Sequence, residues 1–226
     1  MTMKWGNTMI RLILMTAALA ASGAAHAAEP VRFSIDGVAL TAPLPSGYCV
    51  PTGRDKATAD VLASGDQQNI TLATLIRCDM AGRDGGSGND YMLIKTPKAS
   101  TGVVVSRPDL LKMLGAEFGK AEWQGERSDR ARQDAAKGLS EAFDTPMTIE
   151  GELKPRGTDA DCAYLGGQLQ VTGNGADYPI ILGGCITSAG NKVVMVYTYD
   201  DPGKGGGVAG KMRTARNVAV SIKPAP

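Results

Sequence analysis

The sequence has almost no histidine, and its one imidazole, His26, lies in a segment that we expect to be removed. Residues 1–27 follow the order of a secretory signal peptide: basic residues near the start, an apolar run over 12–21, and small residues before the expected cleavage point. The predicted mature chain, 28–226, then contains no histidine. This excludes a serine–histidine–aspartate triad, a cysteine–histidine pair and every histidine-ligated metal site.

The chain also lacks an excess of charge and a second long apolar run. Removal of 1–27 takes away two of the 24 basic residues and none of the 23 acidic ones, which leaves a formal net charge of −1. A nucleic-acid-binding surface needs clustered basic residues, so we expect no nucleic-acid partner. No later run reaches the roughly 18–20 apolar residues of a transmembrane helix. We therefore predict a periplasmic or secreted protein whose partner is an unknown protein or an envelope ligand.

Cysteine is scarce, and its count is even: Cys49, Cys78, Cys162 and Cys185. In an exported protein this indicates two disulfides, for which three connectivities exist. We favour Cys49–Cys78 and Cys162–Cys185 because each pair is local in the sequence. The alternative is a zinc ion held by four thiolates. It is disfavoured because such sites use closely spaced C-x2-C pairs, which this chain lacks.

Patterns of apolar residues predict both strands and helices. Alternating and β-branched residues predict strands at 31–40, 70–78, 91–96 and 218–223, the first of them turning at 43–47. Apolar residues at helical spacing predict a helix from 106 or 107 to 118. Charged pairs four residues apart suit a second, more polar helix at 126–143, and further helices are expected at 55–64 and at about 208–217. The expected fold class is α+β: an antiparallel sheet packed with helices, forming a single domain over 28–226 and stapled by two disulfides.

The two halves of the mature chain share a weak pattern. Residues 34–37 (SIDG) resemble 148–151 (TIEG), and a cysteine follows each motif at a similar distance. An internal repeat over about 31–100 and 146–223 is one interpretation. The other, which we favour, is coincidence within any disulfide-stapled α/β chain.

The order of these features resembles the plan of PsbP-type domains. The shared features are a proline- and glycine-containing turn at 43–47, antiparallel strands, and a terminal helix that runs into 219–223 (AVSIK). The resemblance implies an α/β/α sandwich and a non-catalytic accessory or assembly role. The two predicted disulfides depart from that family, and no functional residue is carried over.

One segment matches a calcium-binding motif. Residues 85–93 (GGSGNDYML) fit the nonapeptide of parallel β-roll proteins, in which Asp90 would be a calcium ligand. That motif binds calcium as a stacked array, whereas it occurs here once. We favour the alternative, a glycine-rich turn that enters the strand at 91–96.

A second segment resembles a phosphate-binding loop. Residues 205–211 (GGGVAGK) follow a predicted strand and precede a predicted helix. The next residue is Met212, so the hydroxyl that binds Mg²⁺ in such loops is missing. We favour a loop that feeds the final helix.

Two pairs of acids raise the question of catalysis. Asp159 and Asp161, like Asp200 and Asp201, have the spacing of a cation site or an acid–base pair, and they equally suit turns. We favour turns. The alternative is a histidine-free hydrolase that uses paired carboxylates or a serine and a lysine. Because the chain has no G-x-S-x-G or S-x-x-K box, we predict no catalytic, cofactor-binding or metal-binding residue.

Aromatic residues make up only 5% of the chain, yet most tyrosines fall in or beside predicted strands: Tyr91, Tyr164, Tyr178, Tyr197 and Tyr199. If several of them share one face of the sheet, they form an aromatic binding surface. Trp123, the one tryptophan of the predicted mature chain, is either a stacking platform for a ligand or the edge of a core. The function that these features favour is a non-catalytic binding or accessory protein of the cell envelope.

Overall fold

The computed structural model describes residues 29–83, 89–203 and 206–226, so the predicted signal peptide lies outside the described residues. The strands are β1 (Val31–Ile35), β2 (Val38–Ala42), β3 (Tyr48–Cys49), β4 (Asn69–Arg77), β5 (Tyr91–Pro97), β6 (Met147–Thr158), β7 (Ala163–Gly173), β8 (Ala176–Ala189), β9 (Lys192–Asp200) and β10 (Lys223–Pro224). The helices are α1 (Gly53–Ser64), α2 (Arg107–Phe118), α3 (Glu126–Phe143) and α4 (Gly207–Ala219), with 3-10 turns η1 (Lys98–Ser100) and η2 (Ala121–Gln124).

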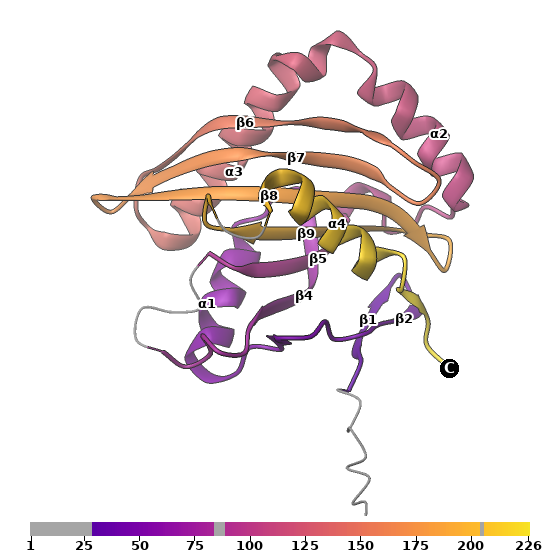
Figure 1. Ribbon diagram of the computed structural model, residues 1–226, viewed down its shortest axis with the longest axis horizontal. Coiled ribbons are helices and arrows are strands. Elements are labelled where there is room, and N and C mark those ends of the chain that lie inside the picture. Colours follow the sequence, from indigo (N-terminus) through magenta and orange to yellow (C-terminus); the bar gives the residue numbers. More distant parts are fainter. Residues whose placement is uncertain (1–28, 84–88, 204–205) are drawn as a thin grey trace, which may run out of the picture.

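Seven antiparallel strands form the main sheet in the order β3-β4-β5-β9-β8-β7-β6. A smaller sheet pairs β1 with β2 and β2 with β10. Figure 1 shows α4 in front of the main sheet and α2 and α3 on its other side, so the layers are helix, sheet and helix. The predicted fold class, α+β with an antiparallel sheet, is confirmed.

The face of the sheet under α4 is tightly packed. Ala215, Val218 and Ala219 of α4 join a core that includes Val194 and Val196 of β9. The helix lies so close to β8 that a Cβ placed on Gly183 would be 2.3 Å from the backbone nitrogen of Met212. Glycine is therefore required at 183 to admit the helix.

The predicted helices are confirmed within a few residues of their expected ends. The Ser106 hydroxyl caps α2 by accepting a hydrogen bond from the Asp109 backbone N–H, and Pro108 occupies the first turn. Helix α3 has no such side-chain cap; it ends at Asp144 in a left-handed conformation with φ 48°. Its main attachments are instead tertiary contacts with η2, β6 and α1.

Two of the predicted strands are wrong in extent. The segment 31–40 is not one strand but a hairpin, because Asp36 and Gly37 both adopt positive φ, 46° and 79°, as a two-residue turn of this kind requires. The segment 218–223 is mostly not a strand: α4 continues to Ala219, residues 220–222 form a turn after the helix, and only Lys223 begins β10. The apolar residues read there as a strand are Val218 and Ile222, which instead pack in the core beneath α4.

Both predicted disulfides are confirmed. Cys49 joins Cys78 and Cys162 joins Cys185, with Cα–Cα distances of 5.1 Å and 5.3 Å. The second pair is fully buried in the core under α4. Within the described residues, no helix has the length and apolarity needed to cross a membrane.

The two segments on which the repeat was proposed have different conformations. Residues 34–37 form the turn between β1 and β2, whereas 148–151 lie inside β6. The internal repeat stays a prediction, as does the extent of the single domain.

Candidate functional site

A cavity of about 1010 Å³ lies between α3 and the face of the main sheet opposite α4. Strands β5 to β9 form its floor, α3 forms its roof, and the segment after α1 closes one side. This volume is at the upper end of the range typical of small-molecule sites. Protein interiors are otherwise close-packed, so a space of this size is a distinctive feature of the fold.

The floor is apolar because alternate residues of each strand point to it. Residues paired across adjacent strands lie on the same face of the sheet: Ile149 lies opposite Val171, and Val171 lies opposite Tyr178. The aliphatic floor residues are Leu93, Met147, Ile149, Leu153, Leu165, Leu169, Val171, Ile180 and Leu182. Several of them, Ile149, Leu169 and Ile180 among them, are only half-buried. The floor therefore offers apolar surface that the chain itself does not cover.

The roof turns small and apolar side chains toward this floor. Ala131, Ala135, Leu139 and Phe143 line the cavity from one side of α3, and Phe143 is 40% exposed. The helix is held at its C-terminal half by a backbone contact with the end of α1. A Cβ on Gly138 would be 1.8 Å from the carbonyl oxygen of Gly65, so these two backbones touch directly. Helix α3 thus spans the cavity without filling it.

Tyrosines form the part of the floor contributed by β5 and β9. Tyr91 and Tyr199 stack with ring centroids 4.4 Å apart and an interplanar angle of 12°. Tyr197 lies two residues before Tyr199 and lines the same cavity, as does Tyr178 of β8. Four of the five tyrosines singled out in the sequence therefore share this face. The fifth, Tyr164, lies on the α4 side, where its hydroxyl donates to Asp159 (2.7 Å).

Burial determines the ionisation of these phenols. Desolvation raises the pKa of Tyr91, of Tyr197 and of Tyr199 above its ordinary value, and the negative charge of Asp66 raises the last two further. The hydroxyls therefore stay protonated at neutral pH. They are hydrogen-bond donors beside the aliphatic part of the cavity floor.

An ion pair stands beside the tyrosines. Lys95 Nζ lies 2.6 Å from Asp66 Oδ2, and both side chains are largely buried. Burial raises the pKa of Asp66, but Lys95 and hydrogen bonds from Asn69 outweigh it, so the net pKa is lowered. This pair has only one signal in the sequence, a lysine inside the otherwise mainly apolar strand predicted at 91–96, and it is not among the residues predicted for a site.

Trp123 lies at the end of the cavity near the start of α3. It packs edge-on against Phe118 with centroids 5.4 Å apart, and the Arg127 guanidinium lies 5.8 Å from its ring centroid. Trp123 therefore borders a core, as one interpretation expected, and it also lines the cavity. Its role as a stacking platform for a ligand stays a prediction.

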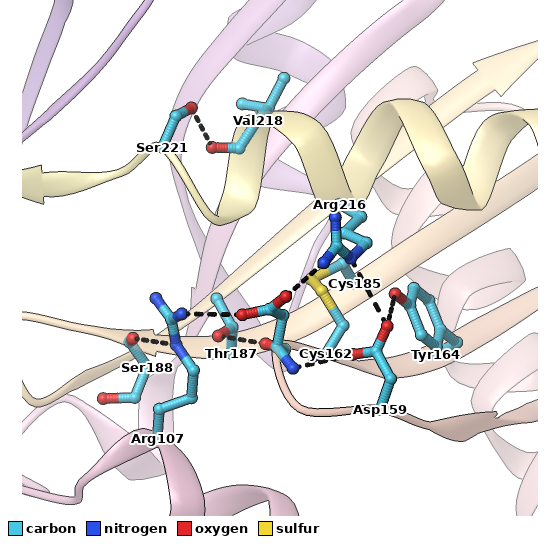
Figure 2. The surroundings of a disulfide bond; sticks show 11 residues. Arg107, Asp159, Cys162, Tyr164, Cys185, Thr187, Ser188, Arg216, Val218 and Ser221 are labelled. Atoms are coloured by element: carbon cyan, nitrogen blue, oxygen red, sulfur yellow. Dashed lines mark hydrogen bonds and ion pairs between the residues drawn. A yellow bond between two sulfur atoms is a disulfide. The ribbon is translucent and has the colours of Figure 1, made fainter.

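The first acid pair belongs to a network around the buried disulfide. Figure 2 shows Arg216 of α4 reaching the acids beside Cys162–Cys185. Its guanidinium pairs with Asp161 and lies 3.5 Å from Asp159, and Arg107 approaches Asp161 from α2 at 3.2 Å. The Asp159 carboxylate also accepts the backbone N–H groups of Asp161 and Cys162 at 2.8 Å each. The preferred turn interpretation is thus correct for Asp159.

This environment is a poor one for acid–base chemistry at Asp159. Burial raises the pKa of its carboxyl, but the Tyr164 hydroxyl, two backbone N–H groups and Arg216 outweigh that effect and lower it. A general acid at neutral pH needs the opposite shift.

The second acid pair is also held by interactions within the protein. Asp200 and Lys211 form a buried ion pair at 2.6 Å, with side-chain exposures of 6% and 7%. Asp200 also accepts the backbone N–H of Asp201 (2.8 Å), as expected of a turn. The lysine of the phosphate-loop motif is therefore buried in an ion pair, while residue 205 of that motif lies outside the described residues.

The calcium motif lies partly outside the described residues, at 85–88. Its Asp90 accepts a hydrogen bond from the Tyr48 hydroxyl (2.6 Å) and lies 3.9 Å from the Arg77 guanidinium. Calcium binding at Asp90 stays a prediction.

No protein-family model matches the chain, and no curated protein matches it by sequence. Among solved structures it is similar to cyanobacterial PsbP (CyanoP) from Synechocystis sp. PCC 6803, with 12% identity and a TM-score of 0.40. The match covers 92% of this chain and 99% of that one. The resemblance expected from the sequence is thus confirmed as a weak likeness of fold, and it carries no ligand or residue role.

Proposed function

We propose that this chain is an exported, non-catalytic binding protein of the cell envelope that holds an apolar ligand in the cavity between α3 and the sheet. The observation that carries the proposal is the unfilled apolar floor beneath α3. A helix normally packs its apolar face against the sheet beneath it. Here Ala131 and Ala135 face the sheet and stay exposed, so a ligand is needed to bury both surfaces.

The location rests on separate observations. Two disulfides are typical of proteins that fold in an oxidising compartment, and the predicted signal peptide at 1–27 agrees with export. We therefore place the protein in the periplasm or outside the cell. Its ligand would be a molecule available there, such as one derived from a lipid.

Filling the cavity tests the proposal. The probe is N-phenyl-1-naphthylamine, whose fluorescence rises in apolar surroundings, titrated into the purified mature chain. We expect saturable binding that weakens at least tenfold in the double variant Ala131→Trp/Ala135→Trp, because both side chains enter the cavity. The matched control is Gln133→Trp/Lys137→Trp, which has the same spacing on α3 but involves residues that do not line the cavity.

Circular dichroism and urea unfolding would establish that all three proteins are folded. Absence of probe binding to the wild type would contradict the proposal. Equal weakening by the two double variants would also contradict it, since the probe would then sit elsewhere.

A further inference from the structure

Three tyrosines and the Lys95–Asp66 pair lie at the β5–β9 side of the cavity floor. From α3, Arg127 and Arg130 also line the cavity, and each is paired with a glutamate. Tyr91 and Tyr199 extend the register of β5 and β9 as a cross-strand pair, and Tyr197 follows on the same face of β9. The charge of Asp66 acts on the hydroxyls of both Tyr197 and Tyr199. We call Tyr91, Tyr197 and Tyr199 the tyrosine cluster.

The hydroxyls of the tyrosine cluster make few contacts with other polar groups of the described residues. Among the described residues, neither the Tyr91 nor the Tyr199 hydroxyl hydrogen-bonds to another group, and Tyr197 has only a 3.7 Å contact with the Met195 sulfur. The side chains of Tyr91, Tyr197 and Tyr199 are half-buried and line the cavity, so their open donors are available to an acceptor on a ligand.

The charge balance at this side decides what kind of acceptor fits. Lys95 is already neutralised by Asp66 at 2.6 Å, and Asp66 also accepts from the Asn69 side chain. The pair therefore offers no unbalanced charge to a ligand. An anionic head would bring a second negative charge near Asp66, and a cationic head would have to compete with Lys95. An uncharged oxygen acceptor meets neither penalty.

The rest of the floor suits a hydrocarbon chain. The cavity floor extends from the tyrosine cluster across β8 and β7 to β6. The sheet is about 19 Å wide from β5 to β6, because four strand spacings separate these two strands. Leu169, Val171 and Ile180 line this part and are aliphatic. The cavity thus has a donor-rich side and a long apolar side.

We propose that the ligand is an uncharged amphiphile with a long acyl chain, whose oxygen-bearing head accepts hydrogen bonds from the tyrosine cluster while its chain lies on the floor formed by β6 to β8. This inference rests on the proposed function and adds the class of ligand. It places a glyceride-like ester or hydroxyl head, and not a carboxylate or an amine, beside Tyr91 and Tyr199.

Displacement of bound N-phenyl-1-naphthylamine tests the head-group preference. The competitors are 1-monooleoylglycerol, oleate and oleylamine, which share one chain and differ in charge, each used below the concentration at which it forms aggregates. We expect the glyceride to displace the probe at a concentration at least tenfold lower than either charged competitor at neutral pH. Equal displacement by all three would overturn the inference.

The double variant Tyr91→Phe/Tyr199→Phe tests the position of the head. It keeps both rings and removes two donors. The affinity for the glyceride should therefore fall about threefold to tenfold for each lost hydrogen bond, while the affinity for the probe stays the same. Tyr164→Phe, on the opposite face, is the control and should leave glyceride binding unchanged.

The two proposals fail in different ways. If the probe itself does not bind, the proposed function is wrong. If the probe binds but the glyceride displaces it equally well from the wild type and from the Tyr91→Phe/Tyr199→Phe variant, only the head-group assignment is wrong.

Discussion

The ring of Tyr197 lies over Gly184 of the neighbouring strand, so closely that a Cβ at position 184 would be 2.4 Å from its Cε1 atom. The two residues are opposite each other in the β8–β9 register. Glycine is required here because the aromatic ring occupies the place of a side chain. This contact fixes the position of Tyr197 on the cavity floor.

Gly184→Ala should therefore displace the Tyr197 ring and disturb the cavity. We expect the free energy of unfolding to fall by about 1–3 kcal/mol, the usual cost of overpacking, and probe affinity to fall as well. Urea unfolding and probe titration measure the two effects. Gly102→Ala is the control because a Cβ at 102 meets no atom within 4 Å. A Gly184→Ala protein as stable as this control would show that the ring moves aside without cost.

The buried pair of Asp200 and Lys211 yields a prediction about stability. Lys211→Met leaves the Asp200 carboxylate in the interior without its cation, and breaking a buried pair in this way costs about 3–5 kcal/mol. The double variant Asp200→Asn/Lys211→Met removes the stranded charge and should recover at least half of that loss. Chemical unfolding measures both proteins. If the single variant loses less than about 1 kcal/mol, the pair behaves as a solvent-exposed one.

The two disulfides should differ in their accessibility to a reductant. Cys78 is exposed and Cys49 half-buried, whereas Cys162 and Cys185 are fully buried. Under native conditions dithiothreitol should open Cys49–Cys78 first, and Cys162–Cys185 should react only as the chain unfolds. Timed alkylation followed by peptide mass spectrometry gives the order. Earlier modification of Cys162 would contradict the packing under α4.

Loss of the buried disulfide should also be costly. Cys162→Ala/Cys185→Ala removes a link across a 23-residue separation, for which about 2–5 kcal/mol is typical. The same change at Cys49 and Cys78 is the matched comparison, with a separation of 29 residues.

The sequence predicted the elements well where their signals are local. Ser106 and Pro108 mark the start of α2, and the cysteine spacing was enough to choose the disulfides. The hairpin at Asp36 and Gly37 was missed because the alternation of apolar residues continues on both sides of a two-residue turn.

The cavity was beyond sequence reasoning for a different reason. Tyr91 and Tyr199 are separated by more than half of the predicted mature chain, and only the pairing of β5 with β9 brings their rings together. The tyrosines were recognised as strand residues, but their common face depends on the register of several strands. The unfilled space under α3 also depends on the contact between Gly65 and Gly138. A contact between two such distant residues cannot be predicted from the spacing of apolar residues.

The raised tyrosine pKa values predict a loss of stability at high pH. A phenol whose pKa is higher in the folded state than its unfolded value of about 10 stabilises the fold below that pH and loses this contribution as the pH rises through the folded value. Burial, aided by Asp159, raises the pKa of Tyr164 to about 12, and Tyr91, Tyr197 and Tyr199 are raised mainly by burial. The free energy of unfolding should therefore fall steadily above pH 10. The tyrosinate absorbance of the folded protein should also appear at a higher pH than that of the urea-unfolded chain.

In Tyr91→Phe/Tyr199→Phe the free energy of unfolding should fall less steeply with pH, because two of the tyrosines with a raised pKa are gone. An unchanged slope would mean that these two phenols reach solvent, and that the donor-rich side of the cavity is open to water.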